Sequence, residues 1–227
     1  MNCWICGQPA GSGEHRIKAS DLRMVFGHVS QKEPIFFHNA LRRNEPIGGI
    51  KSDKLKSDAL ICADCNNRKT QPHDRAWERL SGYLDKRQAP IRAGDLVKLH
   101  KAFPGAVRES MLNVHLFFAK LFGCLIVEHK LAIDITGFSR AILSGTPHPK
   151  LFISFVPQIG PPGKKMVGVS DLNTAKLAGR VAYATWIYHL EKFSVRVIYA
   201  EPGEDRKGLI DAWHPSCITK CVRVVPI

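Results

Sequence analysis

The sequence has no long uninterrupted apolar run and no apolar segment close to its first residue. Two residues lead straight into Cys3, so the pattern of a secretory signal is missing and we expect a cytoplasmic protein. The longest apolar stretch, 114–127, is interrupted by His115, Lys120 and Gly123. It is also shorter than the roughly 20 residues needed to cross a bilayer. We therefore expect no membrane-spanning segment and no membrane partner.

Acidic residues are scarce. The chain has 33 Lys and Arg against 20 Asp and Glu, which gives a formal net charge of +13. Residues 1–94 hold 16 basic and 10 acidic residues, and residues 95–227 hold 17 and 10, so both halves are basic. This balance favours a polyanionic partner such as nucleic acid. The alternative, that the basic side chains are simply solvated and aid solubility, stays open.

The composition is that of a folded protein, with 44% hydrophobic and 23% charged residues. No internal repeat or low-complexity tract is visible. A chain of 227 residues can hold two modest units, and the Gln88-Ala89-Pro90 segment interrupts a predicted helix. We place a domain boundary there, giving units of 1–94 and 95–227.

The hydrophobic pattern predicts an α+β protein. Helical spacing of apolar residues predicts a helix after Cys65, through Trp77 and Leu84, and a buried helix over 106–129. Residues 24–57 are interpreted as a long loop with short strands. The C-terminal unit is predicted as an α+β domain with an antiparallel sheet, since strand-like runs lie at 151–156, 166–169, 181–190, 195–199 and 222–225.

Four of the seven cysteines form two matched pairs, Cys3-x-x-Cys6 and Cys62-x-x-Cys65. A two-residue spacer lets two thiolates reach one tetrahedral Zn²⁺, and two such pairs complete its coordination shell. Such a zinc would be structural and would connect segments 55 residues apart. The alternative is four buried free cysteines.

Glu14-His15 lies between these pairs, and Asn66 follows Cys65 directly. The order Cys-x-x-Cys, acidic-His, Cys-x-x-Cys-Asn resembles the His-Asn-His (HNH, ββα-metal) endonucleases, in particular their zinc-containing, endonuclease VII-like branch. The resemblance covers about residues 1–85. It implies an N-terminal zinc-stapled ββα-metal nuclease module. Glu14 stands where the family more often has Asp or His, and the stretch from His15 to Asn66 is longer than usual.

The resemblance implies that His15 is the general base, and that Glu14 and Asn66 hold a catalytic Mg²⁺ or Mn²⁺. It also implies hydrolysis to 5′-phosphate and 3′-hydroxyl ends. This chemistry fits the residue types, because histidine titrates near neutral pH and the other two offer hard oxygen ligands. In ideal strand alternation Glu14 and His15 point to opposite faces, so a turn or twist must re-aim one of them.

We predict that DNA contacts Arg68 and Lys69 at the start of the helix, and the basic Arg42 and Arg43 in the loop. Each could equally be solvated. Other candidates are ambiguous between function and structure: His38-Asn39 as a motif asparagine or a turn, His73-Asp74 as a metal ligand or a helix cap, His214 with Cys217 and Cys221 as a metal site or core, and Trp186, Tyr188 and His189 as base-stacking or core residues.

The sequence thus predicts a divalent-metal-dependent DNA endonuclease that can act as a homodimer, with residues 95–227 positioning substrate or mediating assembly. Two alternatives stay open. One is a non-catalytic, zinc-finger-like nucleic-acid-binding protein that uses the same cysteines and basic surface. The other is an RNA-directed nuclease.

Overall fold

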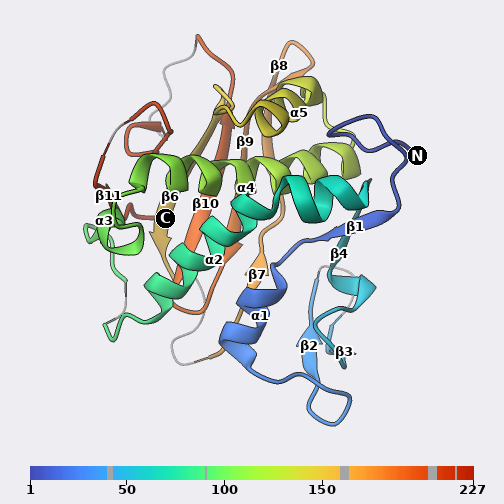
Figure 1. The fold of residues 1–227 in the computed structure, drawn as a ribbon, viewed down its shortest axis with the longest axis vertical. Helices are drawn as coiled ribbons and strands as arrows, with labels where there is room; N and C mark the ends of the chain where they lie inside the picture. The colour runs from blue at the N-terminus through green and yellow to red at the C-terminus, as the bar shows by residue number, and fades with distance from the viewer. Residues whose placement is uncertain (40–42, 90, 159–163, 204–208, 218) are drawn as a thin grey trace.

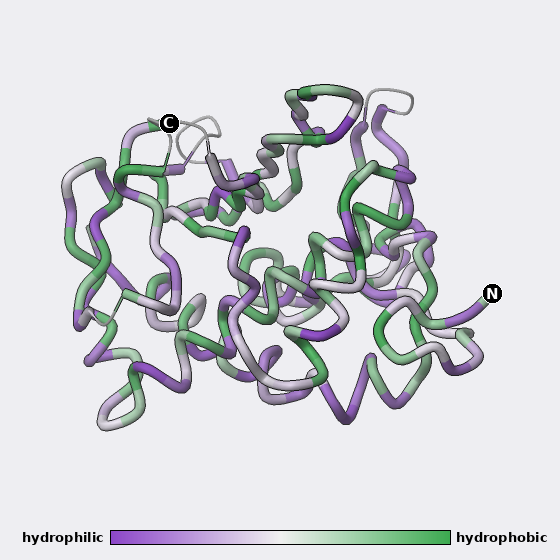
Figure 2. Tube along the Cα trace, turned by 90° about the horizontal axis from the view of Figure 1, so that it is seen from above, coloured by the Kyte–Doolittle hydropathy of each residue, from purple (hydrophilic) through white to green (hydrophobic). Residues whose placement is uncertain are grey.

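The long helix α4 (Val107–Glu128) crosses the middle of the molecule, with α2 (Gln71–Asp85) packed along it (Figure 1). The computed structural model describes residues 1–39, 43–89, 91–158, 164–203, 209–217 and 219–227. Behind these helices lies a sheet from the C-terminal half, and the two chain termini lie toward opposite sides of the molecule (Figures 1 and 2).

Small elements dominate the N-terminal half. Strand β1 (Ser12–His15) pairs antiparallel with β4 (Lys56–Ile61), and β2 (Ile35–Phe37) pairs with β3 (Glu45–Ile47). This half also contains short helical segments: α1 (Ala19–Phe26), the 3-10 turn η1 (Asp53–Leu55) and the π-helical turn η2 (Asp64–Lys69) that leads into α2. The paired strands β1 and β4 thus form a hairpin with a long connection that contains α1, β2, β3 and η1, and η2 and α2 follow it.

The C-terminal half forms a five-stranded antiparallel sheet in the order β6-β10-β9-β7, with β8 also paired to β9. Helix α5 (Ile135–Ser144) precedes it and packs on α4, and the final strand pairs with β5 near the start of this half. The remaining bounds are β5 (Leu96–Lys98), α3 (Leu99–Ala102), β6 (Leu151–Pro157), β7 (Gly168–Val169), β8 (Asn173–Leu177), β9 (Arg180–His189), β10 (Phe193–Ala200) and β11 (Cys221–Arg223).

One hydrophobic core runs across the predicted boundary at residue 94. Trp77 of α2 stacks on Phe117 of α4, with ring centroids 5.4 Å apart, and meets Phe118 and Tyr188 edge-on. Buried aromatic pairs of this kind stabilise by about 0.5–1.5 kcal/mol each beyond the area they bury. The division into two domains stays a prediction.

The three residues that interrupt the apolar run of α4 each have a structural reason. His115 accepts a hydrogen bond from the His148 backbone N–H at 3.1 Å, and Lys120 pairs with Glu14. Gly123 leaves room for the Trp4 ring, because an added Cβ would lie 2.2 Å from it. Within the part of the chain described, α4 is the one helix long and apolar enough to cross a membrane, and 72% of its apolar window is buried in the protein.

The α+β class with antiparallel sheets is confirmed, and so are the helices predicted after Cys65 and over 106–129. The interpretation of residues 24–57 as loop and strands missed the end of α1, which begins after Lys18 without a side-chain cap. Helix α5 was missed although Asp134 caps it and Gly145 ends it in the left-handed region. Strand β8 is exposed at every residue, so it has no burial alternation to reveal it.

Candidate functional site

The four predicted zinc ligands come together. The sulfur atoms of Cys3, Cys6, Cys62 and Cys65 all lie within 4.8 Å of one another, and the Cys6 and Cys62 sulfurs are 3.5 Å apart. Four thiolates at about 2.3 Å from one Zn²⁺ would lie just under 4 Å from each other, so the cluster fits a tetrahedral zinc. These cysteines could hold such a metal.

One local contact favours the thiolate form of Cys62 within this cluster. The backbone N–H of Cys65 points at the Cys62 sulfur, 3.3 Å away, and holds the pKa of the Cys62 thiol at about 7, below its usual range. The cluster lies against the C-terminal half, since Trp4 packs over Gly123 of α4 and the Ser139 hydroxyl of α5 donates to the Ile5 carbonyl.

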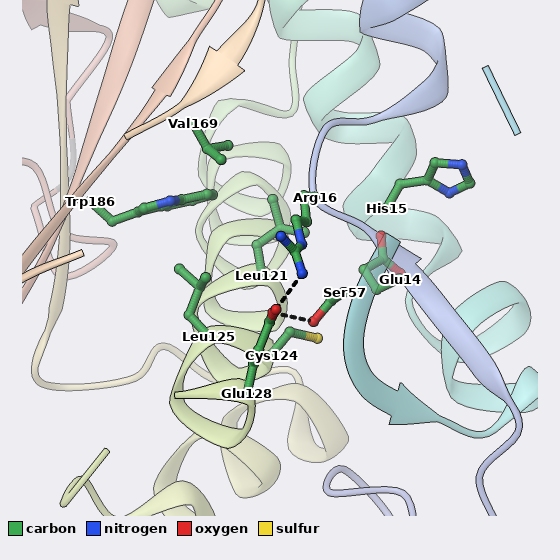
Figure 3. Close-up of a pocket in the computed structure, with 10 residues that line it drawn as sticks. All are labelled: Glu14, His15, Arg16, Ser57, Leu121, Cys124, Leu125, Glu128, Val169 and Trp186. Atoms are coloured by element: carbon green, nitrogen blue, oxygen red, sulfur yellow. Dashed lines mark hydrogen bonds and ion pairs between the residues drawn. The ribbon is translucent and has the colours of Figure 1, made fainter. Parts of the chain in front are cut away.

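Strand β1 carries Glu14 and His15, and its register with β4 shifts between Gly13 and His15. A bulge of this kind re-aims the side chains of a strand. Glu14 is buried against α4, whereas the His15 ring is half-buried and in Figure 3 points away from Glu128 and Trp186. The structure therefore places the two neighbours in different surroundings on the same short strand.

The His15 ring has one clear partner. Its Nε2 lies 3.2 Å from the backbone carbonyl of Ile50, in the loop before η1. Because a carbonyl only accepts, this contact places the ring proton on Nε2 and leaves Nδ1 with its lone pair. Burial lowers the pKa of His15, and the Ile50 carbonyl acts in the opposite direction. The ring is therefore a neutral proton acceptor at pH 7.

Glu14 belongs to a buried charge cluster that the sequence did not reveal. The fully buried ammonium of Lys120 lies 3.1 Å from Glu14 Oε2, 3.0 Å from Asp74 Oδ1 and 3.2 Å from the Thr70 hydroxyl. Asp74 also pairs with Lys18 at 3.1 Å. Burial raises the pKa of Glu14 and the ammonium opposes it, while the two carboxylates outweigh burial and raise the pKa of Lys120.

Asn66 turns its side chain toward β1. Its Nδ2 donates to the Ser12 hydroxyl at 2.6 Å and to the Gly13 carbonyl at 3.4 Å. Because Asn66 follows Cys65 of the cysteine cluster, it links this cluster to the strand that carries Glu14 and His15.

A small cavity of about 20 Å³, enough for one water molecule, lies between the β1–β4 hairpin, α4 and the large sheet (Figure 3). On its wall the Glu128 carboxylate pairs with Arg16 and accepts from the Ser57 hydroxyl at 2.8 Å. These contacts connect β1 and β4 to the end of α4. The cavity is too small for a nucleotide.

The predicted DNA-contacting residues differ in their surroundings. Arg68 and Lys69 both pair with Asp64, at 2.5 and 3.5 Å, on the surface of η2. Arg43 is exposed, and Arg42 lies outside the described residues. Arg68 and Lys69 are therefore accessible to DNA, but both already pair with the carboxylate of Asp64.

Both ambiguous dipeptides of the N-terminal half have structural partners. His38 is exposed, and its Nδ1 accepts from the Asn44 backbone N–H at 3.2 Å. The buried His73 Nδ1 lies 2.7 Å from the Asn113 side-chain oxygen. The interpretation of Asp74 as a helix cap is wrong, because α2 begins earlier and Asp74 is used by Lys120 and Lys18.

The ambiguous C-terminal residues are not gathered into a metal site within the described part of the chain, where the cysteine cluster is the group found. Cys217 is exposed, so core packing does not describe it, whereas the half-buried His214 bonds to the His148 carbonyl at 3.1 Å and packs against His115 and Phe152. Trp186 and Tyr188 are buried core residues, and Tyr188 donates to Asp21 at 2.6 Å. Neither ring is available to stack on a base.

Comparisons of the chain with models of protein families, with curated proteins and with solved structures found no match. The functional assignment therefore depends on the residues and contacts described above.

Proposed function

We propose that this chain is a divalent-metal-dependent endonuclease of the HNH type that hydrolyses phosphodiester bonds of DNA, with His15 as the general base. One observation supports this more than any other. The His15 ring is fixed through Nε2 to the Ile50 carbonyl at 3.2 Å, on a strand that Asn66 links to a four-cysteine cluster. A half-buried, neutral imidazole with Nδ1 open is suited to taking a proton from water.

The phosphate side of the reaction needs a cation. Among the described residues, Oε1 of Glu14 and Oδ1 of Asn66 are without a hydrogen-bond partner, and both are hard oxygen donors that suit Mg²⁺ or Mn²⁺. Such an ion would neutralise charge that develops on the phosphate and the leaving oxygen. Lys120 would keep Glu14 ionised and in place, since its ammonium contacts the other carboxylate oxygen.

The choice of DNA follows from charge. The excess of 13 positive charges favours a polyanion, and the exposed Arg68 and Lys69 lie on η2, shortly after β4, while the exposed Arg43 lies just before β3. The zinc proposed at the four cysteines would be structural, because four thiolates leave no open coordination position for substrate.

The test is nicking of supercoiled plasmid in Mg²⁺ or Mn²⁺ by the wild-type chain and by His15→Ala. Removal of a general base costs about 10²- to 10⁴-fold in rate, so nicking should fall at least 100-fold while retention on DNA is unchanged. The matched control is His28→Ala, because His28 is exposed beyond the end of α1. Equal nicking by wild type and His15→Ala would overturn the proposal.

The rival candidate is a non-catalytic, zinc-containing nucleic-acid-binding protein. It is favoured by the Glu14–Lys120 pair, because an ammonium already neutralises the carboxylate expected to bind metal. This candidate predicts DNA retention with no divalent-ion-dependent nicking in any variant. Parallel assays with duplex DNA, single-stranded DNA and RNA separate the DNA nuclease from an RNA-directed one.

A further inference from the structure

A second pocket lies in the C-terminal half, away from the His15 hairpin. It has a volume of about 380 Å³, within the range of small-molecule sites. Its wall is formed by the first turns of α5, the segment that leads into β6, and Tyr199 of β10. None of the residues proposed for the nuclease contributes to it.

A buried histidine points a donor into this pocket. His148 is 4% exposed and its three other polar atoms are engaged: Nδ1 accepts from the Lys150 N–H at 3.3 Å, the backbone N–H donates to His115, and the carbonyl meets His214. Since Nδ1 accepts, the ring proton is on Nε2. Among the described residues this Nε2–H has no acceptor.

Gly137 keeps the space in front of that donor open. A Cβ added to Gly137 would lie 3.0 Å from His148 Nε2 and 4.0 Å from Asp134 Oδ2, so both groups face the same point. Gly137 is also the third residue of α5, where backbone N–H groups lack helical partners and the helix dipole favours an anion. The ring of Phe138 stacks on His148 at 3.9 Å and fixes the plane of the donor.

The charged groups on the wall are Arg140, Lys150 and Asp134. Arg140 lies one helical turn after Gly137 and is exposed, and Lys150 pairs with Glu201 at 2.7 Å. Asp134, the acid of this set, uses Oδ1 to cap α5 through the Thr136 N–H at 2.9 Å. The wall thus carries two cations against one carboxylate, with Lys150 compensated by Glu201, beside the apolar Ala141, Pro147 and Pro149.

We propose that this pocket binds a phosphate group, with His148 Nε2–H and the α5 N-terminus as donors and Arg140 as the cation. Its size and partly apolar wall suit a phosphate that is attached to an organic group. The phosphate could come from a free nucleotide or from the backbone of a bound nucleic acid. Both sources present the same oxygen acceptors to the same donors.

The test uses calorimetric titration of the full chain with adenosine 5′-monophosphate, and with adenosine as the probe that lacks phosphate. Wild type should bind the monophosphate and not adenosine. Arg140→Gln and Gly137→Ala should each weaken binding at least tenfold. Arg108→Gln is the matched control, because Arg108 is an exposed arginine in the first turn of α4.

A second arm measures retention of a 16-base-pair duplex by the same variants. If only the duplex responds to Arg140→Gln and Gly137→Ala, the phosphate belongs to a nucleic-acid backbone. If both probes bind the two variants as they bind wild type, or adenosine binds as well as its monophosphate, the proposal is wrong. Nicking by His15→Ala is a separate readout, so this proposal and the nuclease proposal can fail independently.

Discussion

The two parts of the chain bury opposite kinds of charge. Among the described residues, the buried acids Glu14 and Asp21 both belong to residues 1–94, while the buried ammonium, Lys120, belongs to α4. The C-terminal half also contacts Asp21, because the Tyr188 hydroxyl donates a hydrogen bond to its carboxylate at 2.6 Å. The N-terminal half contributes both acids, while the C-terminal half contributes the cation for Glu14 and one donor to Asp21, beside the donors Trp77 and Ser81 of α2.

The N-terminal half depends on α4 because Lys120 of this helix neutralises the buried Glu14. A two-stranded hairpin is at best marginally stable alone, and a buried carboxylate without a partner costs several kcal/mol. Four cysteines can join the ends of the hairpin segment, but they do not neutralise Glu14. We infer that residues 1–94 adopt this arrangement only with α4 in place.

Lys120→Met should have the largest effect, because it removes the ion pairs of Lys120 in α4 with the N-terminal half. It leaves the buried Glu14 without its cation and removes one of the two cations that pair with Asp74, and loss of one partner of a buried pair destabilises by about 3–5 kcal/mol. Urea unfolding measures the change in the free energy of unfolding. Adding Glu14→Gln should recover part of the loss, and exposed Lys101→Met should cost little. If Lys120→Met unfolds at the wild-type midpoint, the buried pair does not hold the halves together.

His148→Gln tests a buried titratable group of the C-terminal half through the pH dependence of stability. Burial lowers the pKa of His148 from 6.5 to about 4, so the neutral ring is stabilising above pH 6.5 and this contribution is lost as pH falls toward 4. One such group accounts for about 3 kcal/mol over that window. Unfolding at pH 7 and at pH 4.5 should show a smaller pH dependence in the variant than in wild type. An unchanged pH dependence would refute a buried neutral His148, and exposed His28→Gln serves as the control.

Asn66→Ala should have the smallest effect. It removes the hydrogen bonds from Asn66 to Ser12 and Gly13, which together contribute about 1 kcal/mol. Nicking should fall more than stability does, because the same residue is proposed to bind the catalytic ion. Asn67→Ala is the control, since Asn67 is exposed and bonds only locally to Ala63. Equal behaviour of the two variants would argue against a special role for Asn66.

Local patterns predicted much of this molecule. The spacing of Cys3, Cys6, Cys62 and Cys65 anticipated the sulfur cluster, and apolar periodicity anticipated α2, α4 and most of the large sheet. The Asp134 cap and Gly145 end of α5 were readable and were overlooked.

Contacts between distant segments could not be predicted in the same way. Lys120 looked like an interruption in an apolar helix, and nothing near it in sequence indicates Glu14 or Asp74. A backbone carbonyl such as that of Ile50 has no signature in sequence, because every residue carries one. Periodicity reports which face of an element is buried, but not which partner that face meets.

The zinc proposed at the four thiolates, which would position the strand that bears Glu14 and His15, can be tested by elemental analysis of the purified chain. Wild type and Cys217→Ser, whose sulfur is exposed and outside the cluster, should each contain one zinc per chain, and Cys62→Ser should contain none. A wild-type chain without zinc, or a Cys62→Ser chain that keeps it, would show that these four thiolates do not form a zinc site.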